Sequence, residues 1–193
     1  MTLRLVLDSG SLNNAAIPTM QGEVETMIRM DKIEKYQLLS EQIRALIEGE
    51  TDSVAVMANV SAIIHETMEF WWTGFYRVKD GELVLGPFQG PVACMHIRYG
   101  KGVCGTAWKE QRTIIVPDVE QFPGHIACSS LSRSEIVVPV FSKGGEVVAV
   151  LDIDSKELST FDETDRAYLE EICKMIPSTT ESIVASSTGS TVS

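Results

Sequence analysis

Apolar residues recur every three to four positions along several stretches of the chain, which is the spacing of helices that bury one face. This pattern predicts helices over residues 32–48 and Val54–Met68, the second with Asp52 as its N-cap. A shorter helix is expected over Val103–Glu110. The chain therefore begins its ordered part with two amphipathic helices and has a short helix near its middle.

The last helix is predicted to begin near Thr160. Thr160 and Glu163 have the spacing of a capping box, in which each side chain accepts a hydrogen bond from the other residue's backbone N–H. The apolar stripe continues through Ile176, and Pro177 then stops the helix because proline lacks a backbone N–H. Cys173 falls on this stripe, so we expect it in the core.

Between these helices the pattern changes to short apolar runs rich in β-formers. The predicted strands form two pairs: Phe70–Val78 with Glu82–Gly86, and Glu135–Phe141 with Glu146–Asp152. The first pair flanks Asp80-Gly81, a strong signal for a two-residue hairpin turn. Hairpins imply antiparallel strands, so we expect an α+β fold with a central antiparallel sheet and helices packed mainly on one face.

The composition describes a strongly acidic protein with a net charge of −11. Nucleic acid and anionic membrane surfaces need a basic face, so neither is expected as a partner. No apolar run approaches the roughly 20 residues of a membrane span, and the N-terminus does not have the pattern of a secretory signal. We therefore expect a cytoplasmic protein with one domain at 31–177, a flexible extension at 1–30 and a disordered tail at 178–193.

Three of the four cysteines, Cys94, Cys104 and Cys128, lie in one Gly- and Pro-rich central stretch. Loop cysteines in a chain without an export signal are more often reactive than structural. The small polar neighbours of Cys128 suit a nucleophilic thiolate, and either of the other two thiols could resolve its sulfenic acid. Burial of Cys128 as a small hydrophobe is one alternative. A zinc site that also uses His96 and His125 is another, although their spacing is not that of the usual structural sites.

Acidic residues supply a second candidate component of a site. Asp152 and Asp154 alternate along a strand, so both carboxylates should lie on one face of the sheet. If they share a pocket with Glu135, mutual repulsion should raise at least one pKa. Such a set could bind an ammonium group and protonate a leaving oxygen. Ordinary solvation of acids at a strand end is the alternative.

An aromatic run occupies residues 71–76. Strand alternation puts Trp72 and Tyr76 on one side, and Trp71 and Phe75 on the other. One of these sets is expected in the core, and the other could form an aromatic wall for a ligand. The glycines in segment 100–105 do not fit a P-loop, so we expect them to let a loop fold closely over a site.

Four segments together resemble the free methionine-(R)-sulfoxide reductases, which are small GAF-fold enzymes. These segments are WTGFY, LGPFQGPVACMHIRYGKGVCGTAW, TIIVPDVEQFPGHIACSSLSRSEIVVPV and VLDIDS. The resemblance covers roughly residues 32–177, and GAF domains in general do not carry this set of cysteines. It implies a single GAF domain with a loop-covered pocket on the sheet face opposite the helices, and it implies reduction of free L-methionine-(R)-sulfoxide.

By this resemblance the three loop cysteines have unequal roles. Cys128 matches the nucleophile, which would attack the sulfoxide sulfur and become a sulfenic acid. Cys94 matches the principal resolving cysteine, and Cys104 matches a third site cysteine that can take part in disulfide exchange. Thioredoxin is then the expected external reductant, with no bound cofactor and no metal. The family also suggests a homodimer.

The remaining site residues follow from the same resemblance. Glu135 and Asp154 match catalytic carboxylates, whereas Trp72, Tyr76 and Asp152 match substrate-binding positions. The rival interpretation is a sensory GAF module that binds a small molecule without catalysis.

That rival has one feature in its favour. The segment Phe161-Asp162-Glu163 superficially resembles an element of cyclic-nucleotide-binding GAF domains. Helix capping explains the segment equally well.

Overall fold

A computed structural model of the chain describes residues 30–125 and 130–177. The chain divides into two units, Met1–Asp31 and Lys32–Ser193, and the second unit carries the fold. The predicted N-terminal extension as far as residue 29, the predicted tail at 178–193 and Cys128 lie outside the described residues.

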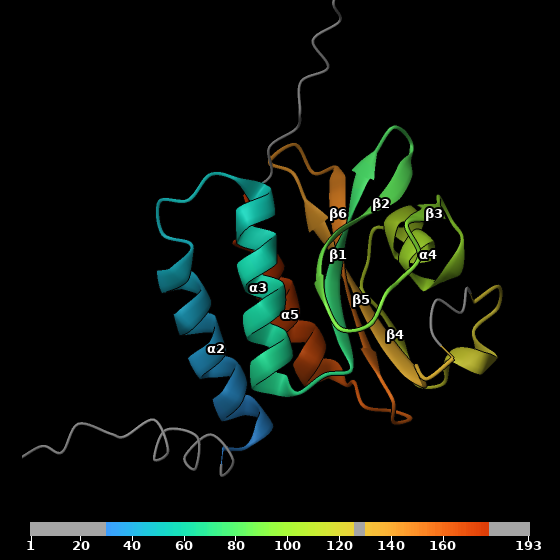
Figure 1. Cartoon of the computed structure of the whole chain (residues 1–193), viewed down its shortest axis with the longest axis horizontal. Helices are drawn as coiled ribbons and strands as arrows, with labels where there is room; N and C mark the ends of the chain where they lie inside the picture. The colour runs from blue at the N-terminus through green and yellow to red at the C-terminus, as the bar shows by residue number, and fades with distance from the viewer. Residues whose placement is uncertain (1–29, 126–129, 178–193) are drawn as a thin grey trace, which may run out of the picture. The chain divides into compact units, whose positions relative to one another are not determined.

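In the described residues the second unit contains one six-stranded sheet with the order β3-β2-β1-β6-β5-β4 (Figure 1). Both predicted hairpins are confirmed, because β1 pairs antiparallel with β2 and β5 pairs antiparallel with β6. Asp80 and Gly81 have φ values of 50° and 81°, the positive values that a type I′ turn requires. The strands are β1 (Trp72–Lys79), β2 (Glu82–Gln89), β3 (His96–Arg98), β4 (Ile114–Val116), β5 (Ser134–Phe141) and β6 (Val147–Ser155).

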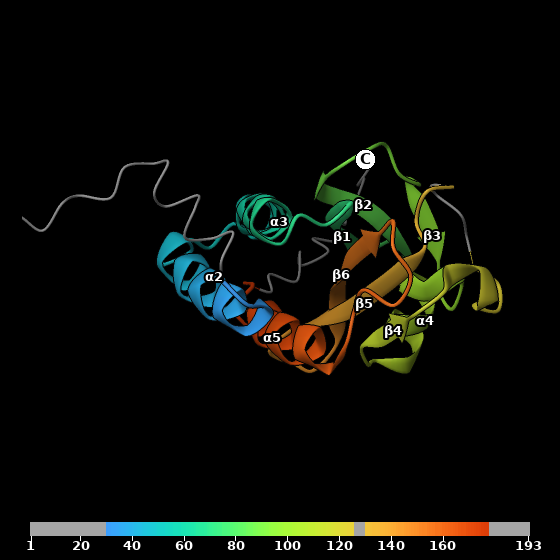
Figure 2. The same cartoon turned by 90° about the horizontal axis from the view of Figure 1, so that it is seen from below.

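The long helices lie together on one face of this sheet (Figures 1 and 2). They are α2 (Lys32–Leu46), α3 (Ser53–Met68) and α5 (Glu163–Lys174). The short helix α4 (Gly102–Glu110) lies on the opposite face, and the 3-10 turn η1 (Val119–Gln121) follows β4. The α+β arrangement predicted from the sequence is therefore confirmed. Within the described part of the chain, no helix has the length and apolar character needed to cross a membrane.

Successive side chains of a strand point to opposite faces, and β6 uses this to build two different interiors. Ala149, Leu151 and Ile153 pack with the three long helices in an apolar core, which also holds Cys173 as predicted. Val150 belongs to a second cluster on the α4 side. The first interior is apolar, and the second borders the polar pocket described below.

The start of α3 agrees with the sequence prediction. The Asp52 side chain accepts hydrogen bonds from the N–H groups of Val54 and Ala55, at 2.8 and 2.9 Å. These N–H groups have no partner inside the helix, so an N-cap of this kind typically contributes about 1 kcal/mol.

The predicted cap of the last helix is wrong by two residues. Asp162, not Thr160, is the N-cap, and it forms a capping box with Asp165. The Asp165 carboxylate accepts from the Asp162 N–H at 2.7 Å, while Thr160 Oγ1 donates to Ser155 Oγ at the end of β6, also at 2.7 Å. The threonine is thus held by the strand, and aspartate supplies the cap.

The other end of α5 is also shorter than predicted. The helix ends at Lys174, before Ile176, which is nevertheless buried. Proline disfavours helical conformation in the residue before it, which fits an end ahead of Pro177. Phe161 packs on Phe70 with ring centroids 5.3 Å apart, so core packing and capping account for the segment Phe161-Asp162-Glu163.

Candidate active site

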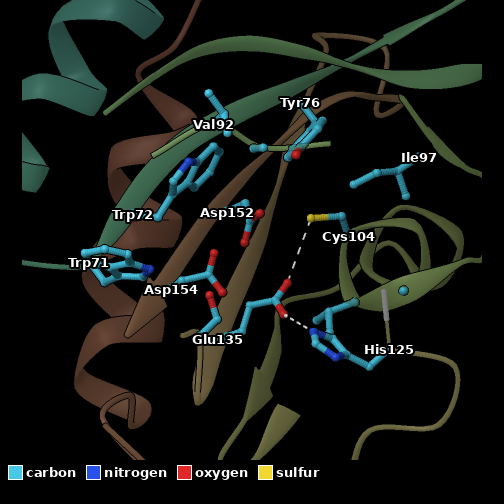
Figure 3. Close-up of a pocket in the computed structure, with 14 residues that line it drawn as sticks. Trp71, Trp72, Tyr76, Val92, Ile97, Cys104, His125, Glu135, Asp152 and Asp154 are labelled. Carbon is cyan, nitrogen blue, oxygen red and sulfur yellow. Dashed lines mark hydrogen bonds and ion pairs between the residues drawn. The ribbon is translucent and has the colours of Figure 1, made fainter. Parts of the chain in front are cut away.

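A pocket lies on the sheet face opposite the long helices, between β1, β5, β6 and the N-terminus of α4 (Figure 3). It leaves a cavity of about 40 Å³, which is enough for a few water-sized groups. Acidic, aromatic and sulfur-containing side chains all line it. The lining residues are Trp71, Trp72, Tyr76, Val92, Ala93, Ile97, Gly102, Val103, Cys104, His125, Ser132, Glu135, Asp152 and Asp154.

Three carboxyl groups meet in this pocket because two neighbouring strands carry them in register. Glu135 of β5 pairs directly with Asp154 of β6, and Asp152 is two residues away on the same face. The predicted placement of Asp152 and Asp154 on one face is therefore confirmed, and Figure 3 shows both pointing toward Glu135. No described lysine or arginine lines the pocket, so the carboxyl groups have no fixed counter-charge there.

Burial and crowding make these groups hold their protons more tightly than usual. Desolvation, followed by the charges of Asp152 and Asp154, raises the pKa of Glu135 well above its ordinary value. Desolvation and the charge of Asp154 likewise raise the pKa of Asp152. Burial raises the pKa of Asp154 to about 6, although a hydrogen bond from Ser132 opposes the shift. The pocket therefore favours the protonated form of its carboxyl groups, and the prediction that crowding would raise at least one pKa agrees with this.

Cys104 brings a thiol to the same cluster from the first turn of α4. The side chain is buried, and its Sγ donates to Glu135 Oε1 across 4.0 Å. Desolvation and the neighbouring Asp152 and Glu135 charges raise the pKa of Cys104 well above the ordinary thiol value. A Cβ on Gly105 would lie 2.5 Å from the Arg98 carbonyl, so this glycine lets α4 pack closely against the end of β3. The prediction placed the glycine segment in a loop, whereas Gly102 and Gly105 belong to the helix.

Trp72 and Tyr76 form the aromatic wall of the pocket. Their rings stack with centroids 6.1 Å apart. Trp72 Nε1 donates to the Pro91 carbonyl and Tyr76 Oη donates to the Cys94 carbonyl, both at 3.0 Å. The wall therefore also fixes the backbone of the loop that carries Cys94, which sequence alternation alone did not indicate.

Trp71 does not follow the predicted alternation. It precedes β1 rather than belonging to the strand, and it lines the pocket beside Trp72 instead of facing away from it (Figure 3). Its outer face is covered by Lys156, whose Nζ lies 3.5 Å from the ring centroid. The turn of the chain at the start of the strand explains why a period of two fails at this residue.

Cys94 lies on the loop between β2 and β3. Cys94 is disulfide-bonded, whereas Cys104 and Cys173 are free thiols. Cys128 lies outside the described residues, but His125 and Ser132, on either side of it in the sequence, both line the pocket.

The predicted zinc alternative is not assembled as proposed. His96 lies on the edge strand β3, where it is exposed and its Nδ1 lies 3.3 Å from Glu82 Oε2. Cys94 is in a disulfide, so it offers no thiolate. His125 does reach the pocket, with Nε2 4.0 Å from Glu135 Oε2, and burial lowers the pKa of His125, which favours the neutral imidazole. The pairing of His125 with an acid ten residues later in the chain carried no recognisable sequence signal.

Comparison with known proteins gives one consistent family. Residues 50–176 match the model of the GAF domain. GAF domain-containing protein A of Dictyostelium discoideum is 56% identical over 146 residues, covering 75% of this chain and 92% of that protein. The free methionine-R-sulfoxide reductase of Escherichia coli is 44% identical over 144 residues, covering 74% and 87%. The X-ray structure of free methionine-R-sulfoxide reductase from Neisseria meningitidis in complex with its substrate is 51% identical, with a TM-score of 0.75 over 77% of this chain and 89% of that one.

An antiparallel sheet with helices on one face and a pocket on the other is the architecture of a GAF domain, and the family model matches most of that fold. Identities of 44% and 51% over most of the length of named relatives narrow the assignment further. The chain belongs to the free methionine-R-sulfoxide reductases, a family of oxidoreductases built on the GAF domain.

Proposed function

We propose that this protein reduces free L-methionine-(R)-sulfoxide to methionine. The observation that carries the proposal is the group of buried Glu135, buried Asp152 and half-buried Asp154, which lies beside an aromatic wall and has no fixed cation among the described lining residues. The names of the relatives from Escherichia coli and Neisseria meningitidis describe the same activity for those proteins.

The pocket can recognise a free amino acid by its charge. A free amino acid carries an ammonium, a group that a methionine within a polypeptide lacks. Entry of this cation favours the ionised form of Asp152, which can then bind it. The rings of Trp72 and Tyr76 can contact the methyl group and the sulfur, since such contacts contribute about 0.3–1.5 kcal/mol. Because the cavity is only about 40 Å³, its walls must move apart to admit a whole amino acid.

The reduction step is assigned to Cys128. Its sulfur attacks the sulfoxide sulfur to form a transient S–S bond. The oxygen then moves to Cys128: the S–O bond of the sulfoxide breaks, an S–O bond forms on Cys128, and the transient S–S bond breaks to release methionine and leave a sulfenic acid. The sulfoxide oxygen is a poor leaving group unless it is protonated. A protonated Glu135 or Asp154 supplies that proton, and the raised pKa values of both groups support this role.

Recycling is assigned to Cys94. Its thiol attacks the sulfenic acid of Cys128, an S–S bond forms and water leaves. Support comes from Cys94 being disulfide-bonded while Cys104 and Cys173 are free. Thioredoxin then reduces the disulfide to two thiols and is itself oxidised. The expected location in a reducing compartment fits this cycle, and the homodimer suggested by the family stays a prediction.

Cys104 has a smaller part in this scheme. Because burial and acidic neighbours raise its pKa, Cys104 is a neutral thiol near pH 7 and a weak nucleophile. It therefore does not compete with Cys128 for the sulfoxide.

The proposal is tested by NADPH oxidation in an assay coupled to thioredoxin and its reductase. We expect turnover of free methionine-(R)-sulfoxide, and no comparable turnover of the S epimer or of peptide-bound sulfoxide. Cys128→Ser should lower the rate by about 10⁴-fold or more, the scale seen when a catalytic nucleophile is removed. Cys173→Ala, which removes a thiol from the opposite core, is the matched control and should retain turnover.

Cys94→Ser separates the chemical step from recycling. This variant should release about one methionine per enzyme and then stop, because its sulfenic acid has no partner. Sustained turnover of Cys94→Ser with thioredoxin would show that another group resolves the intermediate.

A further inference from the structure

The pocket contains a set of ligand atoms that the reductase chemistry does not fully use. Cys104 Sγ and one carboxylate oxygen from each of Glu135 and Asp152 all lie within 4.8 Å of one another. A tetrahedral zinc ion with bonds of about 2.0–2.3 Å holds its ligand atoms roughly 3.5 Å apart. Small side-chain rotations therefore suffice to bring these three atoms into coordination distance.

A second observation points to a ligand at this place. Asp152 is only 7% exposed, and its Oδ1 has no hydrogen-bond partner among the described residues. Figure 3 shows this carboxylate directed into the pocket toward Cys104 and Glu135. A buried polar atom without a partner is rare in folded proteins, and a bound ion is one of the explanations for it.

We propose that Cys104, Glu135 and Asp152 form a binding site for a thiophilic divalent cation of the Zn²⁺ type. On binding, the Cys104 thiol and the protonated carboxyl groups of Glu135 and Asp152 give their protons to solvent. The Cys104 sulfur and one oxygen of each carboxylate then bond to the cation, which stays divalent. The thiolate selects against Mg²⁺ and Ca²⁺, which prefer six or more oxygen ligands. His125, 4.0 Å from Glu135, is placed to orient the ligating carboxylate.

The remaining space favours an open coordination position. The cavity of about 40 Å³ has room for a cation and a water molecule as the fourth ligand. Because the same carboxyl groups are assigned to substrate binding, a bound cation should compete with methionine sulfoxide. This inhibition rests on the proposed function, whereas binding of the cation does not.

The test uses full-length oxidised protein, in which Cys94 is in its disulfide and cannot ligate. Cd²⁺ serves as the probe because a cadmium–thiolate bond absorbs in the ultraviolet. We expect a saturable band at one cation per chain, displaced by Zn²⁺ and not by Mg²⁺. Cys104→Ser should remove the band, and Cys173→Ala should retain it, since Cys173 lies in the other core.

A second variant keeps the test decisive if Cys104→Ser folds poorly. Asp152→Asn should weaken Cd²⁺ binding by at least about 10–100-fold, the range typical for loss of a group that only orients a metal ligand. Asp80→Asn, at the hairpin turn, is the control and should leave affinity unchanged. An unchanged band in folded Cys104→Ser, unchanged affinity in Asp152→Asn, or no band in the wild type would overturn the site.

The inhibition is measured separately from the binding. Zn²⁺ should raise the apparent KM for methionine sulfoxide with little change in kcat. If the metal-free protein has no reductase activity, the proposed function is refuted, but the cadmium band should still appear. Normal turnover with no band would refute the cation site alone.

Discussion

Two buried aspartates on opposite faces of the sheet have contrasting surroundings. Asp165, on α5, is fully buried and every oxygen has a donor. Its Oδ1 accepts from Tyr36 Oη at 2.8 Å, and its Oδ2 accepts from Lys32 Nζ and from the Asp162 N–H. The charge is therefore both paired and hydrogen-bonded, as a buried carboxylate must be if it is to stabilise a fold.

Asp152 is nearly as buried but has the opposite environment. Its neighbours are two further carboxyl groups and a thiol, and its Oδ1 has no partner among the described residues. An arrangement of this kind opposes folding, since each ionised form is desolvated and repelled by the next. The comparison supports a stabilising role for Asp165 and the ligand-binding role that we propose for Asp152.

The largest expected effect is a loss of domain stability when Asp165 is substituted. Asp165→Asn places an amide N–H₂ where only donors converge and removes the charge that pairs with Lys32. We expect the free energy of unfolding to fall by about 3 kcal/mol, the lower end of the cost of breaking a buried pair, because Lys32 is partly exposed. Urea denaturation measures it. The kcat/KM of the folded fraction should not change, and a selective loss of activity would contradict the structural role.

The corresponding substitution of Asp152, on the other face of the sheet, should reduce activity and leave stability unimpaired. Asp152→Asn should lower kcat/KM about 50-fold, mainly through KM, because a hydrogen bond to a charged group contributes about 1.5–3 kcal/mol. Its free energy of unfolding at pH 7 should be unchanged or higher, since a repelled carboxyl group is removed. Steady-state kinetics and urea denaturation on one preparation measure both. A destabilised variant with normal KM would make Asp152 a structural residue like Asp165.

Dependence on pH sharpens the contrast at Asp154. Its pKa is raised from 3.8 to about 6 in the folded protein, so between these values the native state holds a proton that the unfolded chain has released. The free energy of unfolding should therefore decrease as pH rises from about 4 to 6, by about 1–2 kcal/mol for this group, and then level off. Asp154→Asn should remove that part of the slope in urea denaturation curves measured across the range. An identical slope in both proteins would mean that Asp154 is solvated.

The smallest expected effect concerns Lys156, whose ammonium group lies over the ring of the pocket residue Trp71. Lys32 pairs with a buried carboxylate, whereas Lys156 lies on the face of Trp71. Lys156→Ala should cost less than about 1 kcal/mol in stability, the value of an exposed cation–π contact. We expect at most about a threefold change in KM from a less ordered Trp71, measured beside Lys143→Ala as a control on a distant hairpin turn. A tenfold change would show that Lys156 contacts the substrate directly.

Much of the fold was predictable because its signals are local. The turn residues Asp80 and Gly81 fix a hairpin within a few positions, and Asp52 caps the helix that follows it. The alternation that places Asp152 and Asp154 on one face also depends only on neighbouring residues. Thr160 and Asp162 are both suitable N-cap residues, and the sequence pattern selected the wrong one. The Thr160 hydroxyl donates a hydrogen bond to Ser155 at the end of β6, so it is not available as the cap.

The sequence by itself therefore determined the α+β class, both hairpins, the acidic strand end and the resemblance to a family. Tertiary structure decided which buried acids are paired and which are not. Asp165 meets Lys32 and Tyr36 from about 130 positions away in the chain, and Cys104 meets Asp152 only because α4 packs against the sheet. The pKa of a carboxyl group depends on desolvation and on charges within a few ångströms. Those distances are set by packing, so no spacing along the chain distinguishes the paired Asp165 from Asp152, which we propose binds a ligand.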